Sequence, residues 1–352
     1  MTAGNGQFDQ SKPDGFQHYL GGLARYPAAS PIRRRTVRLP TALTLILGIP
    51  WFALSIIVVS TLAALVSSNN TIALATTGLF VMSGAAVFFG RTEYFIARVM
   101  FRYRQPTMAE QHRLDQVWGA VTQRAGVRSN DYRLWVQDTD ELNAFAAAGH
   151  IVAVTRAALS LPPPRLAAVL AHELGHHLAG HSWAALLTYW YSLPGRLVAR
   201  VLYRVTHFVF AIFAGFTVGA AGGAVAGRAG GAAAGCVIAP LVRLFPFLLL
   251  ALTTWFFYSI HPALVLLWAT PFVVAGINRH QEKSADRTAA DLGYGLPLLE
   301  ILYGWLHAGH DDARQREGLR ANLFASHPSC AARIQALEKH LYGPNRTGGG
   351  GR

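Results

Sequence analysis

Residues 171–177 read Ala-His-Glu-Leu-Gly-His-His, which places His172 and His176 four positions apart. On an α-helix, residues at this spacing differ by only about 40° in direction, so both imidazoles can bind one metal ion from the same face. Catalytic zinc takes three protein ligands and leaves its fourth position to water, whose pKa falls to about 7. Glu173 would lie beside that water and could remove its proton. The motif therefore predicts a zinc-dependent hydrolase.

The sequence around the motif predicts the helix that this chemistry requires. Residues 162–164 are all proline, and proline fits the first turn of a helix. From Arg165 onward the chain is rich in strong helix formers, with Leu166, Val169 and Leu170 on one face. The alternative is a chance match on an unrelated amphipathic helix. The helical context makes the zinc site the stronger interpretation.

The third metal ligand is expected from a later helix. A metzincin would carry Gly at 179 and His at 182, but the chain has Ala179 and Ser182. His177 and His181 match no ligand position, and we expect them at the surface or behind the ligands. About a hundred residues downstream, Glu282 and Asp286 are again four apart, so both carboxylates share one helix face. Glu282 can bind the metal while Asp286 accepts a hydrogen bond from a ligand imidazole.

Four stretches resemble signatures of the HtpX-like family of integral-membrane zinc metallopeptidases, relatives of the CAAX prenyl endopeptidases. They occur in the family's order within residues 132–337. The stretches are Asn143-Ala-Phe-Ala146, His172-Glu-Leu-Gly-His176, Glu282-Lys-Ser-Ala-Asp286 and His327-Pro-Ser-Cys-Ala-Ala-Arg333. The chain departs from the family's usual glycine-rich form at residues 147–150, which read Ala-Ala-Gly-His.

The resemblance implies an active site with one Zn²⁺ ion per chain. The implied metal ligands are His172, His176 and Glu282. The resemblance implies Glu173 as the general base and suggests that His327 and Arg333 lie near the substrate, where we expect His327 to act as a catalytic hydrogen-bond donor to the oxyanion. The implied substrate-binding residues are Asn143, Ala146 and Arg333, and Asp286 would orient a ligand histidine.

The composition indicates a membrane protein. Hydrophobic residues make up 52% of the chain and charged residues only 14%, whereas a soluble domain carries about a quarter charged residues. Residues 41–66 contain no charge, and as a helix they would extend about 39 Å, enough to cross the hydrocarbon core of about 30 Å. A second apolar stretch runs from 71 to about 89. The two predict a transmembrane hairpin with an uncharged connection at 67–70.

Two further apolar stretches lie between the two halves of the predicted metal site. Residues 205–227 predict one span, and residues 244–277 predict one long span or a broken pair, with prolines at 246, 262 and 271 as possible kinks. Glu282 must reach the same ion as His172, so the number of crossings between them must be even. Two crossings there give four spans in all.

Arginines near the first hairpin predict its orientation. Arg33, Arg34, Arg35 and Arg38 precede it, whereas Arg91, Arg98, Arg102 and Arg104 follow it. The connecting loop has no Lys or Arg, so both ends of the hairpin should face the cytoplasm. The net charge of +13 fits anionic lipid headgroups beside the spans, and no nucleic-acid partner is expected.

Together these patterns predict a multi-span α-helical membrane protein with a mainly α, α+β zincin-like catalytic domain, in which a small sheet accompanies the metal-binding helices. Strands are expected at 132–137 and 150–155. The expected segments are an N-terminal cytoplasmic segment (1–40), a transmembrane hairpin (41–99), the first part of the peptidase domain (100–200), a second transmembrane pair (201–278), the second part of the domain (279–342) and a flexible tail (343–352). Cys236 and Cys330 suggest no disulfide framework, which fits a cytoplasmic catalytic domain.

The expected function is cleavage of membrane or misfolded proteins at the cytoplasmic face of a bacterial cell membrane, as in protein quality control. The expected partners are a protein or peptide substrate and the lipid bilayer, and the oligomeric state is left open. One alternative is a prenyl-peptide endopeptidase, which needs a hydrophobic chamber between spans. Another is a non-catalytic membrane scaffold, which would usually have lost Glu173 or a ligand.

Overall fold

A computed structural model describes residues 39–86, 89–147, 149–224, 269–312 and 328–343, together with 247, 251–252, 254–255, 258–259 and 262. The side chains of 206–207, 209–224 and 271 are not described. The expected N-terminal segment up to residue 38, the tail from residue 344 and most of the second transmembrane pair therefore lie outside the described residues.

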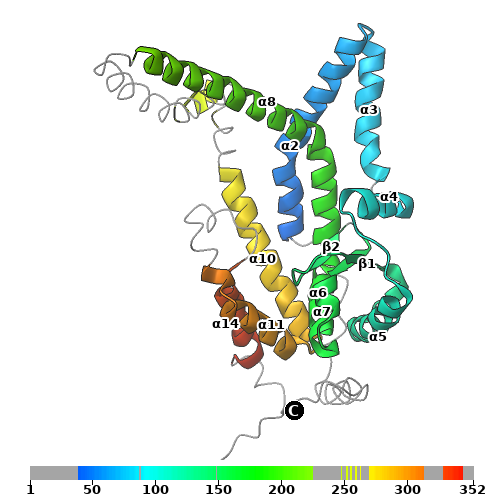
Figure 1. The fold of residues 1–352 in the computed structure, drawn as a ribbon. Helices are drawn as coiled ribbons and strands as arrows, with labels where there is room; N and C mark the ends of the chain where they lie inside the picture. Colours follow the sequence, from blue (N-terminus) through cyan, green and yellow to red (C-terminus); the bar gives the residue numbers. More distant parts are fainter. Residues whose placement is uncertain are drawn as a thin grey trace, which may run out of the picture. The chain divides into compact units, whose positions relative to one another are not determined.

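A three-stranded sheet lies at the centre of the helical part that carries the zinc motif (Figure 1). Its strands are β1 (Arg133–Gln137), β2 (Ala144–Ala147) and β3 (Ile151–Thr155). The order is β1-β3-β2, with β1 parallel and β2 antiparallel to β3. Every residue of β3 is buried, as expected of a central strand whose first four residues are all apolar. The expected strands are confirmed to within one residue, and β2 forms an edge of the sheet.

Helices cover this sheet and complete the core. They are α5 (Met108–Ala125), α6 (Arg156–Leu159), α7 (Pro163–Leu178), α10 (Thr270–Asp291), α11 (Gly295–His307) and α14 (Cys330–Tyr342). Leu166, Leu170 and Leu174 of α7 are fully buried in one cluster with Val152 and Val154 of β3. Because these leucines recur at four-residue spacing, they give α7 one apolar face, and the motif histidines project from the rest of the same helix.

The ends of these helices follow from local sequence signals. Pro163 and Pro164 occupy the first two positions of α7, as the sequence predicted. Thr107 and Glu110 form a capping box at the start of α5, and Ser329 caps α14 through the amide of Ala332. The two prolines therefore fix where the motif helix begins. The start of a helix determines the directions in which its side chains project.

Two long apolar helices precede the catalytic part. They are α2 (Leu39–Val66) and α3 (Asn70–Ala86). Among the described residues, α2 has the length and composition to cross a membrane, and α3 joined to the following short helices passes the same test as a bent pair. The expected hairpin therefore has one candidate span, α2. A second is present only if α3 and the short helices after the bend together form one span.

Helix α8 (His181–Ala224) continues from the motif helix into the third expected span. Its sequence from residue 205 onward is apolar, but most side chains there are not described. The fourth expected span, 244–277, lies largely outside the described residues. The expected total of four spans thus remains a prediction.

The chain forms two compact units. The first contains the described residues up to Ile49, then Thr77–Tyr191, and those from Phe272 onward. The second contains Pro50–Thr76 and the described part of Ser192–Pro271. All residues of the candidate active site described below belong to the first unit.

Candidate active site

Helices α7 and α10 meet at a glycine of the zinc motif. A Cβ atom on Gly175 would lie 3.0 Å from the Cα of Ala285 and 3.1 Å from the Cβ of Thr288. No larger residue fits at 175 without moving α10. This close approach brings Glu282, one turn before Ala285 on α10, next to the histidines of α7.

His172, His176 and Glu282 place three potential ligand atoms together. The two Nε2 atoms are 3.3 Å apart, and the carboxylate of Glu282 lies 3.6 Å from Nε2 of His172 and 3.4 Å from Nε2 of His176. Donors bound to zinc at 2.0–2.1 Å in a tetrahedral arrangement are about 3.3–3.4 Å from one another. Oε2 of Glu282 faces His172 and Oε1 faces His176, so each of these contacts is close to that spacing, and one ligand atom from each residue lies within 4.8 Å of the others. The two-imidazole, one-carboxylate donor set also suits this metal.

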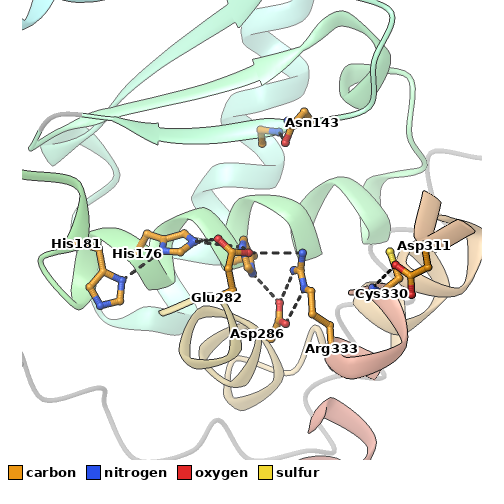
Figure 2. Close-up of polar contacts among 10 residues, drawn as sticks. Asn143, His176, His181, Glu282, Asp286, Asp311, Cys330 and Arg333 are labelled. Atoms are coloured by element: carbon orange, nitrogen blue, oxygen red, sulfur yellow. Dashed lines mark hydrogen bonds and ion pairs between the residues drawn. The ribbon is translucent and has the colours of Figure 1, made fainter. Parts of the chain in front are cut away.

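Asp286 and Arg333 support this group from behind (Figure 2). Oδ1 of Asp286 lies 2.9 Å from Nδ1 of His172, on the side of the ring away from Glu282. Arg333 donates two hydrogen bonds to Asp286, from Nε at 2.9 Å and from Nη2 at 2.6 Å. Its Nη1 atom also lies 3.5 Å from Glu282. All three charged side chains are buried, so the guanidinium compensates both carboxylates.

The pKa values of this group follow from burial and charge. Burial raises the pKa of Asp286, but Arg333 and His172 outweigh this effect and hold it below its usual value. Burial disfavours the charged form of His172, but the carboxylates of Asp286 and Glu282 beside the ring raise the pKa of His172 to about 10. The carboxylates thus favour a positive charge at this imidazole, whether a proton or a metal ion supplies it.

Glu173 is also buried, with 7% of its surface exposed. It follows His172 on α7. Burial, and then the nearby charge of Glu173, raise the pKa of Tyr103, so this phenol stays protonated. The ring of Tyr103 stacks against Phe145 of the edge strand at 6.2 Å. The sequence did not suggest Tyr103, because nothing in the local pattern around it marks a functional residue.

His181 contacts His176, one of the candidate metal ligands, which its sequence position alone did not show. Its Nδ1 atom lies 3.3 Å from Nδ1 of His176, and the ring is 6% exposed. In an unbroken helix, residues five apart would differ by about 140° in direction. Gly180 lies between α7 and α8 and has a φ of +76°. This left-handed turn interrupts the helix and brings the side chain of His181 next to His176. His181 therefore lies behind the candidate ligand His176. The sequence had left open whether it would lie there or at the surface.

His177 fastens the motif helix to the sheet. Its Nε2 atom lies 2.9 Å from the carbonyl oxygen of Ile151, and its ring packs edge-on against Tyr132 at 5.3 Å. Burial lowers the pKa of His177 to about 4. The neutral ring therefore donates its N–H to β3.

The expected substrate-binding residues lie in two places. Asn143 is exposed at the start of the edge strand, where its carbonyl oxygen accepts hydrogen bonds from the amide of Thr155 at 3.0 Å and its hydroxyl at 2.9 Å. Hydrogen bonds alternate along an antiparallel pair, so the backbone of Ala146 points to the open edge. Figure 2 shows the strand that follows Asn143 above the helix that carries His176. Arg333 instead lies against Asp286. His327 lies outside the described residues.

Comparison with known proteins agrees with this geometry. The model of peptidase family M48 matches residues 108–341. The chain belongs to peptidase family M48, a family of zinc-dependent metallopeptidases that covers both HtpX and CAAX protease members. A search of curated proteins found no significant match.

Proposed function

We propose that this protein is an HtpX-like, membrane-embedded zinc endopeptidase that cleaves membrane or misfolded proteins at the cytoplasmic face. The observation that carries the proposal is the clustering of His172, His176 and Glu282, whose facing nitrogen and oxygen atoms lie 3.3–3.6 Å apart, with Glu173 buried as the next residue after His172. A buried carboxylate next to three such donors is the arrangement that metal-assisted hydrolysis requires.

The chain's own residues divide the work of hydrolysis. A zinc ion held by His172, His176 and Glu282 would lower the pKa of a water molecule to about 7 and polarise the scissile carbonyl. Glu173 takes a proton from the attacking water and passes it to the leaving amine. Asp286 keeps the ring of His172 in one orientation, and His181 does the same for His176. Such supporting contacts keep the donor atoms in place during turnover.

The open edge of β2 supports an extended peptide as substrate. A peptide strand that paired with the backbone of Ala146 would extend the sheet by one strand, which is a common mode of peptide recognition. Main-chain pairing does not depend on sequence, which suits substrates recognised by their unfolded state. Asn143 would then contact one end of the bound strand, and His327 remains the proposed donor to the oxyanion.

Helix α2 supports a site beside the bilayer. Its Thr41 hydroxyl donates to the carbonyl oxygen of Ala179, at the end of the motif helix, at 3.0 Å. Its Thr44 accepts from Gln281, which precedes the ligand Glu282, at 3.4 Å. The start of an apolar helix thus touches both metal-binding helices. With the arginines that flank the first two apolar helices, this favours a catalytic site at the cytoplasmic membrane surface.

A prenyl-peptide endopeptidase is the second candidate, because the family includes such enzymes. It would use the same ligands but require a lipid-sized chamber. Incubation of the purified full-length protein with casein and with a farnesylated peptide, each with and without a chelator, separates the candidates. Chelator-sensitive cleavage of casein supports the proposed function. Cleavage of the farnesylated peptide alone supports the second candidate, and no zinc-dependent cleavage of either supports a non-catalytic scaffold.

A further inference from the structure

Glu93 is a buried carboxyl group that the proposed chemistry does not use. It lies on α4 (Gly90–Phe95) and is 2% exposed. One oxygen, Oε1, accepts a hydrogen bond from the backbone amide of Gly149 at 3.0 Å. Nδ1 of His150 lies 3.2 Å from Oε1 and 3.3 Å from Oε2. A buried carboxyl group needs such partners, because it has lost its hydration.

Gly149 and His150 lie in the turn after β2, the strand proposed to pair with a peptide substrate. Strand β2 ends at Ala147 and β3 begins at Ile151, so Gly149 and His150 connect them. A Cβ atom on Gly149 would lie 3.1 Å from Oε1 of Glu93, closer than an ordinary contact. The turn therefore packs closely against Glu93 of α4. A movement of α4 would be passed to the end of β2.

The helical segment that carries Glu93 has two distinct faces. It continues from α4 into the π-helical turn η1 (Ile96–Met100). The inner face carries Glu93, Ile96 and Ala97, and the last two are fully buried against the sheet. The outer face exposes large apolar residues and arginines. These are Phe89 (66% exposed), Tyr94 (41%), Phe95 (58%) and Val99 (55%), with Arg91 and Arg98.

This outer face has the composition of a helix that lies in the headgroup layer of a membrane. Aromatic rings favour the boundary between hydrocarbon and water, and arginines attract anionic headgroups. Residues 89–102 contain three arginines, and their only acidic residue is Glu93, which faces inward. The segment also follows directly on the apolar helix α3, which ends at Ala86.

We propose that α4–η1 binds anionic lipid headgroups and that Glu93 transmits its position to the substrate strand β2. Glu93 is thus a positioning residue for substrate binding. The proposal rests on the proposed peptidase function for its effect on catalysis, but the structural coupling can be measured without any activity.

The kinetic test uses the full-length, zinc-loaded protein in nanodiscs of phosphatidylcholine alone or mixed with phosphatidylglycerol. For the wild type, the anionic lipid should lower the KM of a casein-derived peptide about fivefold, the effect of one basic residue at an anionic surface, and leave kcat unchanged. Glu93→Ala and the double variant Arg91→Gln/Arg98→Gln should each lose this lipid dependence. Glu141→Gln, at an exposed acid before β2, is the matched control and should keep it.

The structural test follows hydrogen exchange of the amides of residues 144–152 in the same nanodiscs. Anionic lipid should slow exchange of Gly149 in the wild type and in Glu141→Gln, but not in Glu93→Ala. Glu93→Gln retains an acceptor for the Gly149 amide and should show a partial response, which keeps the test valid if the alanine variant unfolds. Lipid-dependent exchange in a protein without peptidase activity would support the coupling and reject the proposed function.

Three results would overturn the proposal. One is equal KM and equal exchange in the two lipid mixtures. Another is a lipid response in Glu93→Ala, or in the arginine double variant, that matches the wild type. The third is protection that depends on the number of protein copies per disc and not on lipid charge, which would assign the outer face to a second copy of the chain.

Discussion

Nδ1 of His172 lies 2.9 Å from Oδ1 of Asp286, while its Nε2 faces Glu282 at 3.6 Å. The imidazole therefore stands between two carboxylates with different tasks. In the proposed site, Glu282 would complete the ligand group and Asp286 would fix the orientation of the ring. The contact also explains why Asp286 is needed at four-residue spacing from Glu282, since both must face α7 from the same side of α10.

The two carboxylates should differ in their effect on zinc. Glu282→Ala removes a ligand and should abolish stoichiometric zinc binding. Asp286→Ala removes the orienting partner of His172, for which losses of about 10- to 100-fold in affinity or activity are typical. Zinc dissociation constants from competition with a chromophoric chelator test this ranking. Zinc retained by Glu282→Ala but lost from Asp286→Ala would mean that the roles are reversed.

Replacement of Glu173 should separate metal binding from catalysis. Glu173→Gln keeps the size of the side chain and all three ligands, but an amide cannot act as the base. Zinc content should stay at the wild-type level while casein cleavage falls by at least about 10²- to 10⁴-fold. Metal analysis and a cleavage assay on the same sample measure both, with Glu141→Gln as the control. Full activity, or loss of zinc, would contradict the assigned role.

Arg333 should contribute to stability through its buried ion pair with Asp286. Arg333→Met leaves that carboxylate buried without its guanidinium partner, and removal of one partner of a buried ion pair typically costs about 3–5 kcal/mol. The double variant Asp286→Asn/Arg333→Met should be less destabilised than Arg333→Met alone, because the uncompensated charge is gone. Thermal unfolding in detergent gives the order of the Tm values. If Arg333→Met unfolds at the wild-type Tm and only peptide KM rises, Arg333 serves the substrate instead.

His181 should support zinc binding through His176. His181→Ala removes the ring that faces Nδ1 of His176, and we expect zinc affinity to fall by about 10- to 100-fold. His181→Gln supplies another hydrogen-bond acceptor and should recover part of the loss. His112→Ala, at an exposed histidine on α5, is the control. Equal zinc affinity in His181→Ala and the control would show that the contact has no role at the metal.

The orientation of the chain can be tested with single cysteines in a Cys236→Ser/Cys330→Ser background. Asn69→Cys lies between α2 and α3, and Met108→Cys lies at the 90% exposed first residue of α5. An impermeant maleimide added to intact cells should label Asn69→Cys, because in the proposed orientation the flanking arginines keep both ends of the hairpin in the cytoplasm. It should reach Met108→Cys only after permeabilisation. Labelling of Met108→Cys alone would place the catalytic domain outside.

The amino-acid sequence alone determined the local features of the site. The motif helix, its proline start and the shared face of Glu282 and Asp286 all depend on residues within one or two turns of each other. Helical periodicity is a local property, so spacing along the chain predicted these features. The strands at 132–137 and 150–155 were predictable for the same reason, since their apolar residues alternate with polar ones or follow one another along the chain.

Only the tertiary structure decided which distant side chains meet. Arg333 reaches Asp286 across 47 residues, and Glu93 reaches Gly149 across 56. Neither pair has a periodic spacing, because each contact depends on how separate helices pack on the sheet. His181 is near His176 in sequence, yet their contact requires the left-handed turn at Gly180 between two helices. Such contacts depend on how helices pack and where the chain reverses. The pattern of residue types along the chain does not predict them.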